Sequence, residues 1–207
     1  MTRAKAKSSQ DGATLVEMLV VIVILGAVST AVFGLFYSSN RAYHFTSDVR
    51  EVMDDGRVSL ERIRRELRAG RRVFDDSNAQ RMHFWVDQDQ DSAQEPWEEI
   101  CYVVRSISGE ADRWHLVRWT VGVPDSSRSE VPCDQAPPAD GRTIAATLRD
   151  TAVFSYDCNG VTPCPPTDPT STDVVREVTI NFLLDVRTDA GPDTLAVSAT
   201  VRLRNVA

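Results

Sequence analysis

The stretch that decides the fold is Gly12-Ala-Thr-Leu-Val-Glu17, which leads directly into the uncharged, largely apolar residues 18–40. A short leader with a net positive charge precedes it, and Glu17 is the only charge at the start of the apolar run. Because a helix rises about 1.5 Å per residue, this run can cross the roughly 30 Å hydrocarbon layer of a bilayer. The stretch therefore predicts a membrane-spanning helix.

The helical pattern continues beyond the apolar run as far as residue 69. Apolar residues recur there at spacings of three and four and form one face of a helix: Phe45, Val49, Val52, Met53, Leu60, Ile63 and Leu67, with Gly56 between them. Charges occupy the opposite face, where Glu61 and Arg65 are expected to pair. We predict one helix over residues 14–69, with an amphipathic second half, that ends at Gly70.

After Gly70 the apolar period changes from 3.6 to 2, which is typical of strands. Six strands are predicted, at residues 81–86, 99–104, 113–119, 152–156, 174–186 and 194–205. The turn residues 189–193 join the last two strands into an antiparallel hairpin, and residues 122–142 and 157–173 are expected to be loops. A sheet with one buried face would cover the apolar face of the helix. The predicted fold is therefore α+β, a long N-terminal helix packed against an antiparallel β-sheet head.

The chain has 207 residues and a net charge of −7. Its first twelve residues carry a net charge of +2, so the remainder carries −9. A body this acidic disfavours binding to a nucleic-acid backbone, which needs clustered positive charge. The three histidines are scattered, and the sequence shows no set of residues suited to acid–base or nucleophilic catalysis. We therefore expect a protein that is not an enzyme and has no specific nucleic-acid partner.

The four cysteines, Cys101, Cys133, Cys158 and Cys164, predict two disulfides in a chain that faces outward. Three pairings are possible. The short separation of Cys158 and Cys164 favours a bridge between them, which leaves Cys101 with Cys133. A four-cysteine zinc site is the alternative, although the C-x-x-C spacing typical of such sites is absent.

Four acidic residues fall at positions 1, 3, 5 and 12 of a calcium-binding loop: Asp87, Asp89, Asp91 and Glu98. Ser92 stands where such loops have glycine, Gln94 replaces the central aliphatic residue, and Pro96 lies inside the loop. Predicted strands, not helices, flank it. The spacing therefore allows calcium as the one candidate cofactor, while these departures favour a solvated acidic hairpin loop.

The segment from Gly12 through Glu17 to Gly26 closely resembles the N-terminal signature of type IV prepilins and type II secretion pseudopilins. In that family a membrane aspartic peptidase cuts after the glycine and methylates the new N-terminal amine. The resemblance implies cleavage between Gly12 and Ala13 and N-methylation of Ala13, where the family usually has phenylalanine. It also implies that Glu17, the fifth mature residue, is an assembly contact with the N-terminal amine of a neighbouring subunit.

A looser resemblance, to J-type minor pseudopilins and W-type minor pilins, rests on residues 58–68, the acidic hairpin near 87–91 and the closing residues 201–205. Together the two resemblances imply four regions: a leader peptide at 1–12, a transmembrane and filament-core half of the helix at 13–40, an amphipathic half at 41–70 and a β-rich globular head at 71–207.

The function implied by these resemblances is that of a minor pilin or pseudopilin. Such a structural subunit initiates or caps a type IV pilus, a type II secretion pseudopilus or a DNA-uptake pseudopilus. The implied partners are the prepilin peptidase, other pilins or pseudopilins and an inner-membrane assembly platform. The implied location is a single pass through the inner membrane, with the N-terminus inside and the head outside, followed by the filament.

The alternative is a secreted or signal-anchored binding domain. Residues 1–31 would then be an ordinary secretory signal that is cut near Ser29-Thr-Ala31. The amphipathic helix that continues to residue 69 disfavours this alternative, because a free domain does not need a rigid junction.

Overall fold

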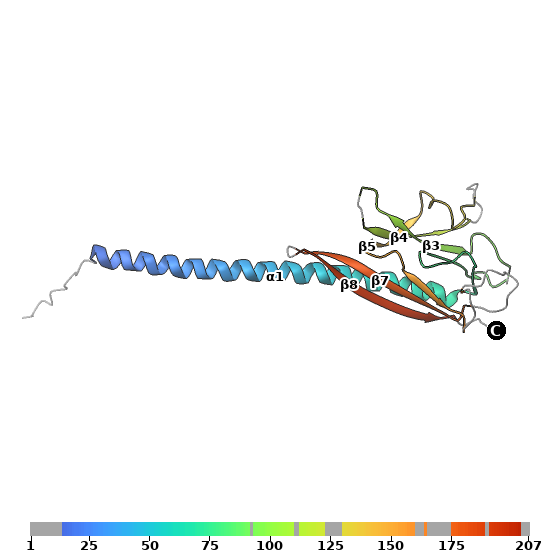
Figure 1. The fold of residues 1–207 in the computed structure, drawn as a ribbon, viewed down its shortest axis with the longest axis horizontal. Coiled ribbons are helices and arrows are strands. Elements are labelled where there is room, and N and C mark those ends of the chain that lie inside the picture. Colours follow the sequence, from blue (N-terminus) through green and yellow to red (C-terminus); the bar gives the residue numbers. More distant parts are fainter. Residues whose placement is uncertain are drawn as a thin grey trace, which may run out of the picture. The chain divides into compact units, whose positions relative to one another are not determined.

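The computed structural model describes residues 14–91, 93–109, 112–122, 130–159, 164, 175–188 and 191–203. The chain divides into two compact units, Met1–Thr46 and Ser47–Ala207. Within the described residues, one α-helix is followed by strands that form an antiparallel sheet, and the C-terminal part of the helix lies beside this sheet (Figure 1). The α+β class predicted from the sequence is therefore confirmed.

Helix α1 spans Leu15–Ala69 without a break, one residue shorter than predicted. It is the one helix of the described residues that is long and apolar enough to cross a membrane. The helix ends where the N–H of Gly70 donates to the carbonyl oxygen of Leu67 at 3.0 Å. A Cβ at Gly70 would lie 3.3 Å from Cδ2 of Phe84, so glycine allows the chain to turn tightly against the sheet.

Eight strands follow α1 in the described residues: β1 Arg72–Val73, β2 Arg81–Trp85, β3 Glu99–Ser106, β4 Trp114–Thr120, β5 Arg142–Leu148, β6 Phe154–Asp157, β7 Glu177–Thr188 and β8 Gly191–Arg202. They form one sheet in the order β1-β2-β3-β4-β5-β7-β6, and β8 pairs with β7. Every pairing between these strands is antiparallel.

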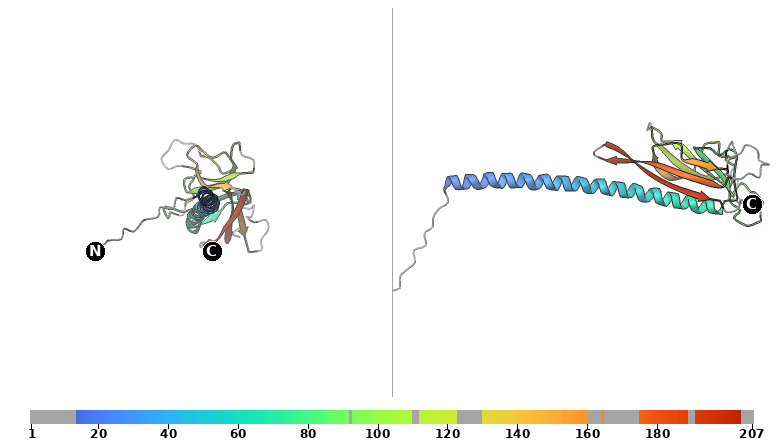
Figure 2. Two further views of the ribbon diagram at one scale, coloured as in Figure 1. Left: turned by 90° about the vertical axis from the view of Figure 1, so that its left-hand side faces the viewer. Right: turned by 60° about the horizontal axis from the view of Figure 1, so that its bottom comes forward.

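The predicted C-terminal hairpin is confirmed. Strands β7 and β8 pair over their whole length, and their register places Phe182 opposite Val197 and Leu184 opposite Leu195. Figure 2 shows both strands beside the C-terminal part of α1. Every second residue of β7 belongs to the main core and is fully or almost fully buried: Val178, Ile180, Phe182 and Leu184.

Strand β5 was not predicted, because its apolar and polar residues do not alternate regularly, and neither do its buried and exposed ones. The register with β4 shifts twice, and the backbone of Thr147 has a positive φ of 60°. Such bulges break the period of two on which a strand prediction rests. The two-residue β1 was not predicted either, because it is too short to show any period. The sequence therefore predicted six of the eight strands that the structure describes.

The main core lies between α1 and the sheet. Leu60, Ile63 and Leu67 are buried on the predicted apolar face of α1, whereas Phe45 on the same face is 42% exposed. A Cβ at Gly56 would lie only 2.7 Å from Cδ1 of Leu184, so glycine is what allows α1 to approach β7 this closely.

The central strands are buried on both faces, whereas the sequence predicted only one buried face. Tyr102 and Leu116 belong to the core beside α1, and Cys101, Val117 and Trp119 belong to a second cluster. Cys133 and Val131 come from the loop that covers this second face. Because side chains alternate across a strand, a loop on the far side is needed to bury consecutive residues of β3.

A polar network fixes α1 to the sheet within the second unit. Glu66 Oε2 accepts hydrogen bonds from the Tyr102 hydroxyl at 2.8 Å and from Arg118 Nε at 2.9 Å. Burial, together with the nearby Glu66 charge, raises the pKa of Tyr102, so the phenol stays protonated and can donate. On the helix surface, Glu61 pairs with Arg64 instead of the predicted Arg65.

Candidate processing and assembly site

The first turn of α1 is closed by Thr14, a residue whose role the sequence interpretation missed. Its Oγ1 accepts a hydrogen bond from the N–H of Glu17 at 3.3 Å, and its carbonyl oxygen accepts from the N–H of Met18 at 3.1 Å. Thr14 is therefore the N-cap, and Glu17 occupies the third helical position. The spacing Thr-x-x-Glu is the signature of a capping box and could have predicted this role.

Glu17 is exposed in the first turn, where its negative charge interacts favourably with the helix dipole. No cation among the described residues forms an ion pair with it. A carboxylate next to a long apolar segment is costly when it is desolvated without a partner. The geometry therefore gives Glu17 a local role in the cap and leaves its carboxylate available to a group from another chain.

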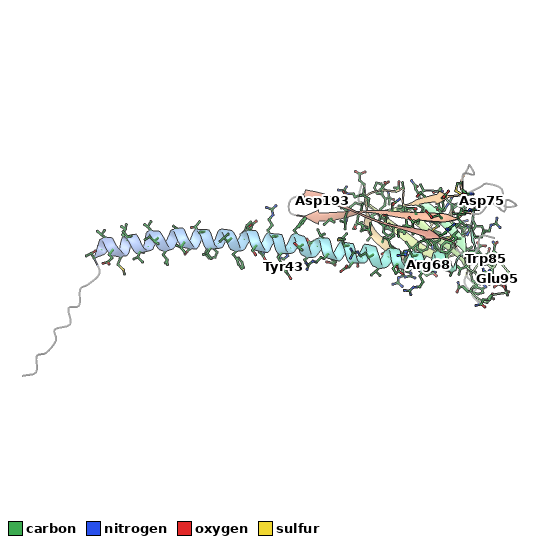
Figure 3. All side chains as sticks on the ribbon, turned by 90° about the horizontal axis from the view of Figure 1, so that it is seen from below. Tyr43, Arg68, Asp75, Trp85, Glu95 and Asp193 are labelled. Carbon is green, nitrogen blue, oxygen red and sulfur yellow. A yellow bond between two sulfur atoms is a disulfide. The ribbon has the colours of Figure 1, made fainter. Side chains whose placement is uncertain are left out.

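The apolar side chains of the first unit are exposed around the helix. In Figure 3 they stand out along this part of α1, and Leu15 and Phe33 are 82% and 73% exposed. Burying apolar surface is worth about 25 cal/mol per Å². A surface this large and this apolar is far more stable against lipid or against other apolar helices than in water.

Gly12 and Ala13, the predicted cleavage and methylation positions, lie outside the described residues. The described helix begins two residues after the Gly12–Ala13 bond. The predicted site residues that the structure describes are Glu17, the four cysteines and the acidic residues near 87–98.

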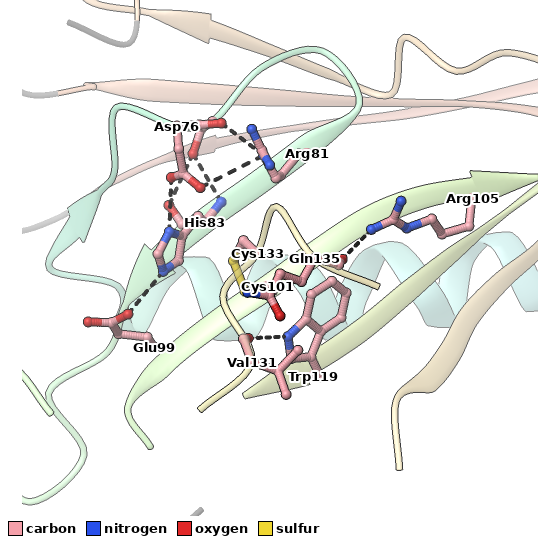
Figure 4. The surroundings of a disulfide bond; sticks show 11 residues. Asp76, Arg81, His83, Glu99, Cys101, Arg105, Trp119, Val131, Cys133 and Gln135 are labelled. Atoms are coloured by element: carbon pink, nitrogen blue, oxygen red, sulfur yellow. Dashed lines mark hydrogen bonds and ion pairs between the residues drawn. A yellow bond between two sulfur atoms is a disulfide. The ribbon is translucent and has the colours of Figure 1, made fainter. Parts of the chain in front are cut away.

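The structure contains the disulfides Cys101–Cys133 and Cys158–Cys164. No free cysteine remains, so the pairing leaves no thiolate for the zinc alternative. Cys101 lies on β3, and its bond to Cys133 holds the covering loop against the second face of the sheet (Figure 4). Trp119 Nε1 donates to the carbonyl oxygen of Val131 at 3.0 Å and holds the same loop.

His83 lies beside this disulfide between two carboxylates, a cluster that the sequence did not predict (Figure 4). Its Nδ1 is 2.9 Å from Asp76 Oδ1, and its Nε2 is 3.2 Å from Glu99 Oε2. Burial lowers the pKa of His83, but the hydrogen bonds and charges of both carboxylates outweigh burial and raise the pKa overall. Burial likewise raises the pKa values of Asp76 and Glu99, but hydrogen bonds and charge interactions, above all with His83, lower them overall.

These shifts predict a pH dependence of stability. Because the folded-state pKa of His83 is raised, its contribution is complete below the usual value of 6.5 and is lost as pH rises through the raised value. We expect His83→Gln to destabilise the protein more at about pH 6 than at about pH 8, as measured by urea unfolding.

His115→Gln is the matched control, because burial and the Arg105 charge lower the pKa of His115. Protonation of His115 therefore disfavours the folded state as pH falls. We expect His115→Gln to favour folding more at the lower pH than at the higher pH. An equal effect of His83→Gln at both pH values would contradict the cluster's role.

The acidic loop brings together three of the four predicted calcium ligands. Asp87, Asp89 and Asp91 each place a carboxylate oxygen within 4.8 Å of the others. Glu98 is not in this group. It is fully buried, and its Oε2 accepts from Trp85 Nε1 at 2.8 Å, so it is engaged inside the fold.

Residues 7–33 match the protein family described as the prokaryotic N-terminal methylation motif. No curated protein and no solved structure matches the chain. The matched segment contains the Gly12–Ala13 bond, Glu17 and the start of the exposed apolar helix. The N-terminus is therefore of the prepilin type, as its resemblance to prepilins predicts.

The class that these features define is that of prepilin-like proteins. An N-terminal methylation motif overlaps the first part of a long helix, which is apolar at first and is followed by an antiparallel β-sheet. This arrangement is pilin-like.

Proposed function

We propose that this protein is a structural subunit of a filament of the type IV pilus class. The prepilin peptidase cuts between Gly12 and Ala13 and methylates Ala13. Residues 13–40 first hold the subunit in the inner membrane and then pack against neighbouring helices in the filament core. The head, residues 71–207, faces outward, and the amphipathic residues 41–70 connect it to the apolar half.

The observation that carries this proposal is the methylation motif on an exposed apolar helix that is continuous with a head-packing helix. The motif covers residues 7–33, and α1 continues from there to Ala69. A signal sequence that is removed would not need to be part of the same helix that forms the core of the domain. A subunit that is pulled out of a membrane by its neighbours needs this continuity.

Within that class, we propose a minor pilin or pseudopilin of the J or W type. The support is the sequence resemblance of residues 58–68, 87–91 and 201–205. Such a subunit initiates or caps a type IV pilus, a type II secretion pseudopilus or a DNA-uptake pseudopilus. Its partners would be other pilins and the inner-membrane assembly platform, with the N-terminus inside and the head outside.

Gly12→Val tests the processing step. A bulky residue at the scissile position is expected to leave the full-length form in the membrane fraction and to remove the protein from sheared filaments. Immunoblots of membrane and filament fractions measure both effects. Ser8→Ala, also in the leader, is the matched control and is expected to behave like wild type. Normal processing and normal filament recovery of Gly12→Val would contradict the proposal.

A further inference from the structure

A groove opens in the second unit, between α1 and the place where β5 and β7 separate. In the described structure, β5 pairs with β7 through a single residue pair, Leu148 with Leu184, so the earlier residues of β5 have no strand beside them on that side. The groove has a volume of about 400 Å³, and its lining residues come mainly from 51–59 of α1 and 143–147 of β5. A hollow of this size can hold side chains of another molecule.

The lining of the groove combines apolar surface with negative charge. Val58 is 71% exposed, although its neighbours one turn away along α1 are all charged. Val52 and Ile144 are half-buried beside it in the lining. Glu51 and Asp55 are exposed and are the only charged residues among the described lining residues. The groove therefore fits a segment that presents a cation together with apolar or aromatic side chains.

The two carboxylates of the lining also repel each other. Glu51 and Asp55 are four residues apart on α1, so they lie on the same face of the helix. A pair of like charges at this spacing destabilises a helix slightly, and a cation placed near both carboxylates removes the repulsion. The lining thus favours a positively charged occupant over a neutral one.

The first unit of the chain carries a matching segment. Arg41 is the only Lys, Arg, Asp or Glu in residues 18–47, and it is exposed. Tyr37 and Phe45 lie four residues before and after Arg41, so the three side chains share one face of α1. Both aromatic side chains are exposed, and no described residue of the same chain forms an ion pair with Arg41. This face therefore presents one cation between two aromatic rings.

We propose that the groove receives the face formed by Tyr37, Arg41 and Phe45 of a second copy of this chain. The guanidinium group of the second copy lies near Glu51 and Asp55, and the aromatic rings cover the apolar part of the lining. The contact buries apolar surface of both copies and gives Arg41 a counter-charge at the end of a long uncharged segment.

This contact sets the stagger between the two copies. Two subunits that are inserted equally deep in a membrane would place Arg41 beside Arg41. To bring Arg41 level with Glu51 and Asp55, one of two parallel helices is shifted along its axis by ten to fourteen residues. A filament provides such a shift, so the inference rests on the proposed function and assigns the groove to contacts between filament subunits.

The test places the photo-crosslinking residue p-benzoylphenylalanine at position 58 of the full-length protein. Val58 is a suitable position because it is exposed at the groove. Crosslinked products from sheared filaments and from membranes are compared by mass spectrometry. In filaments we expect dimers in which position 58 is joined to residues 34–47 of the second copy. In membranes, where the copies are not staggered, the same crosslink is expected to be at least tenfold weaker.

A charge exchange tests the ionic part of the contact. Arg41→Glu in the photoreactive chain places a third negative charge at the groove and is expected to lower the crosslink yield, per subunit recovered in filaments, about tenfold. Adding Glu51→Arg and Asp55→Arg to this variant is expected to restore the yield. Arg65→Glu makes the same charge change at an exposed position outside the groove, and it is the matched control with an expected yield like that of wild type. A loss of Arg41→Glu from filaments that the charge exchange reverses would support the same contact.

The outcomes separate this inference from the proposed function. If the chain is recovered in filaments but position 58 joins another protein or another segment, the inference is overturned and the proposed function stands. An undiminished yield with Arg41→Glu, or a charge exchange that restores nothing, would also overturn it. If the chain is absent from filaments, the proposed function and this inference both fail.

Discussion

Glu17→Gln is expected to be cleaved and inserted in the membrane like wild type, yet to be missing from filaments. In the proposed assembly contact, Glu17 pairs with the N-terminal amine of a neighbouring subunit in an apolar environment. Removing one partner of a desolvated ion pair costs about 3–5 kcal/mol, so incorporation should fall more than about a hundredfold. Quantitative immunoblots of sheared filaments and membranes measure this loss.

Glutamine is the informative replacement, because it can still complete a capping box. Thr14→Ala is the reverse control: it removes the hydroxyl that accepts from the N–H of Glu17 and keeps the charge. Losing an N-cap costs about 1 kcal/mol, so this variant is expected to remain in filaments. If Glu17→Gln assembled normally while Thr14→Ala did not, Glu17 would act only as part of the cap.

Asp185→Ala is expected to destabilise the head by about 3 kcal/mol, the lower end of the range for breaking a buried ion pair. Asp185 is only 4% exposed, and its two carboxylate oxygens lie 3.2 Å from Arg113 Nε and 3.1 Å from Arg149 Nε. It follows Leu184, the residue through which β7 pairs with β5. Its loss leaves two partly buried arginines without this counter-charge where the sheet has little backbone pairing.

Urea unfolding measures this effect as a lower midpoint with an unchanged slope. Asp193→Ala is the matched control, because Asp193 is an exposed carboxylate on the neighbouring β8. Its effect is expected to stay within about 0.5 kcal/mol. A loss below about 1 kcal/mol for Asp185→Ala would mean that the ion pairs do not stabilise the junction of β5 and β7.

The long helix and the C-terminal hairpin could be predicted because each follows one regular period. Leu60, Ile63 and Leu67 repeat at helical spacing, and residues 178–184 alternate as a strand requires. Strand β5 escaped prediction because its bulges disturb this period. The second buried face of β3 was also not predicted. It is covered by a loop that is distant in sequence and is held against β3 by the Cys101–Cys133 disulfide.

In the candidate sites, too, local groupings could be predicted from the sequence and contacts between distant residues could not. The spacing of the acidic residues predicts that Asp87, Asp89 and Asp91 come together, because they are local. The role of Glu98 depends on the Trp85 indole, and the surroundings of His83 depend on the register that places it opposite Cys101. These contacts join different strands and loops, so residue spacing along the chain does not predict them.

The mature N-terminus tests the central claim most directly. Intact-mass and N-terminal peptide measurements on protein from membranes that contain the prepilin peptidase should find a chain that begins at Ala13 and carries one added methyl group. That result would show processing of the prepilin type at the Gly12–Ala13 bond. A chain that begins near Val32, or one that still carries residues 1–12, would contradict the account.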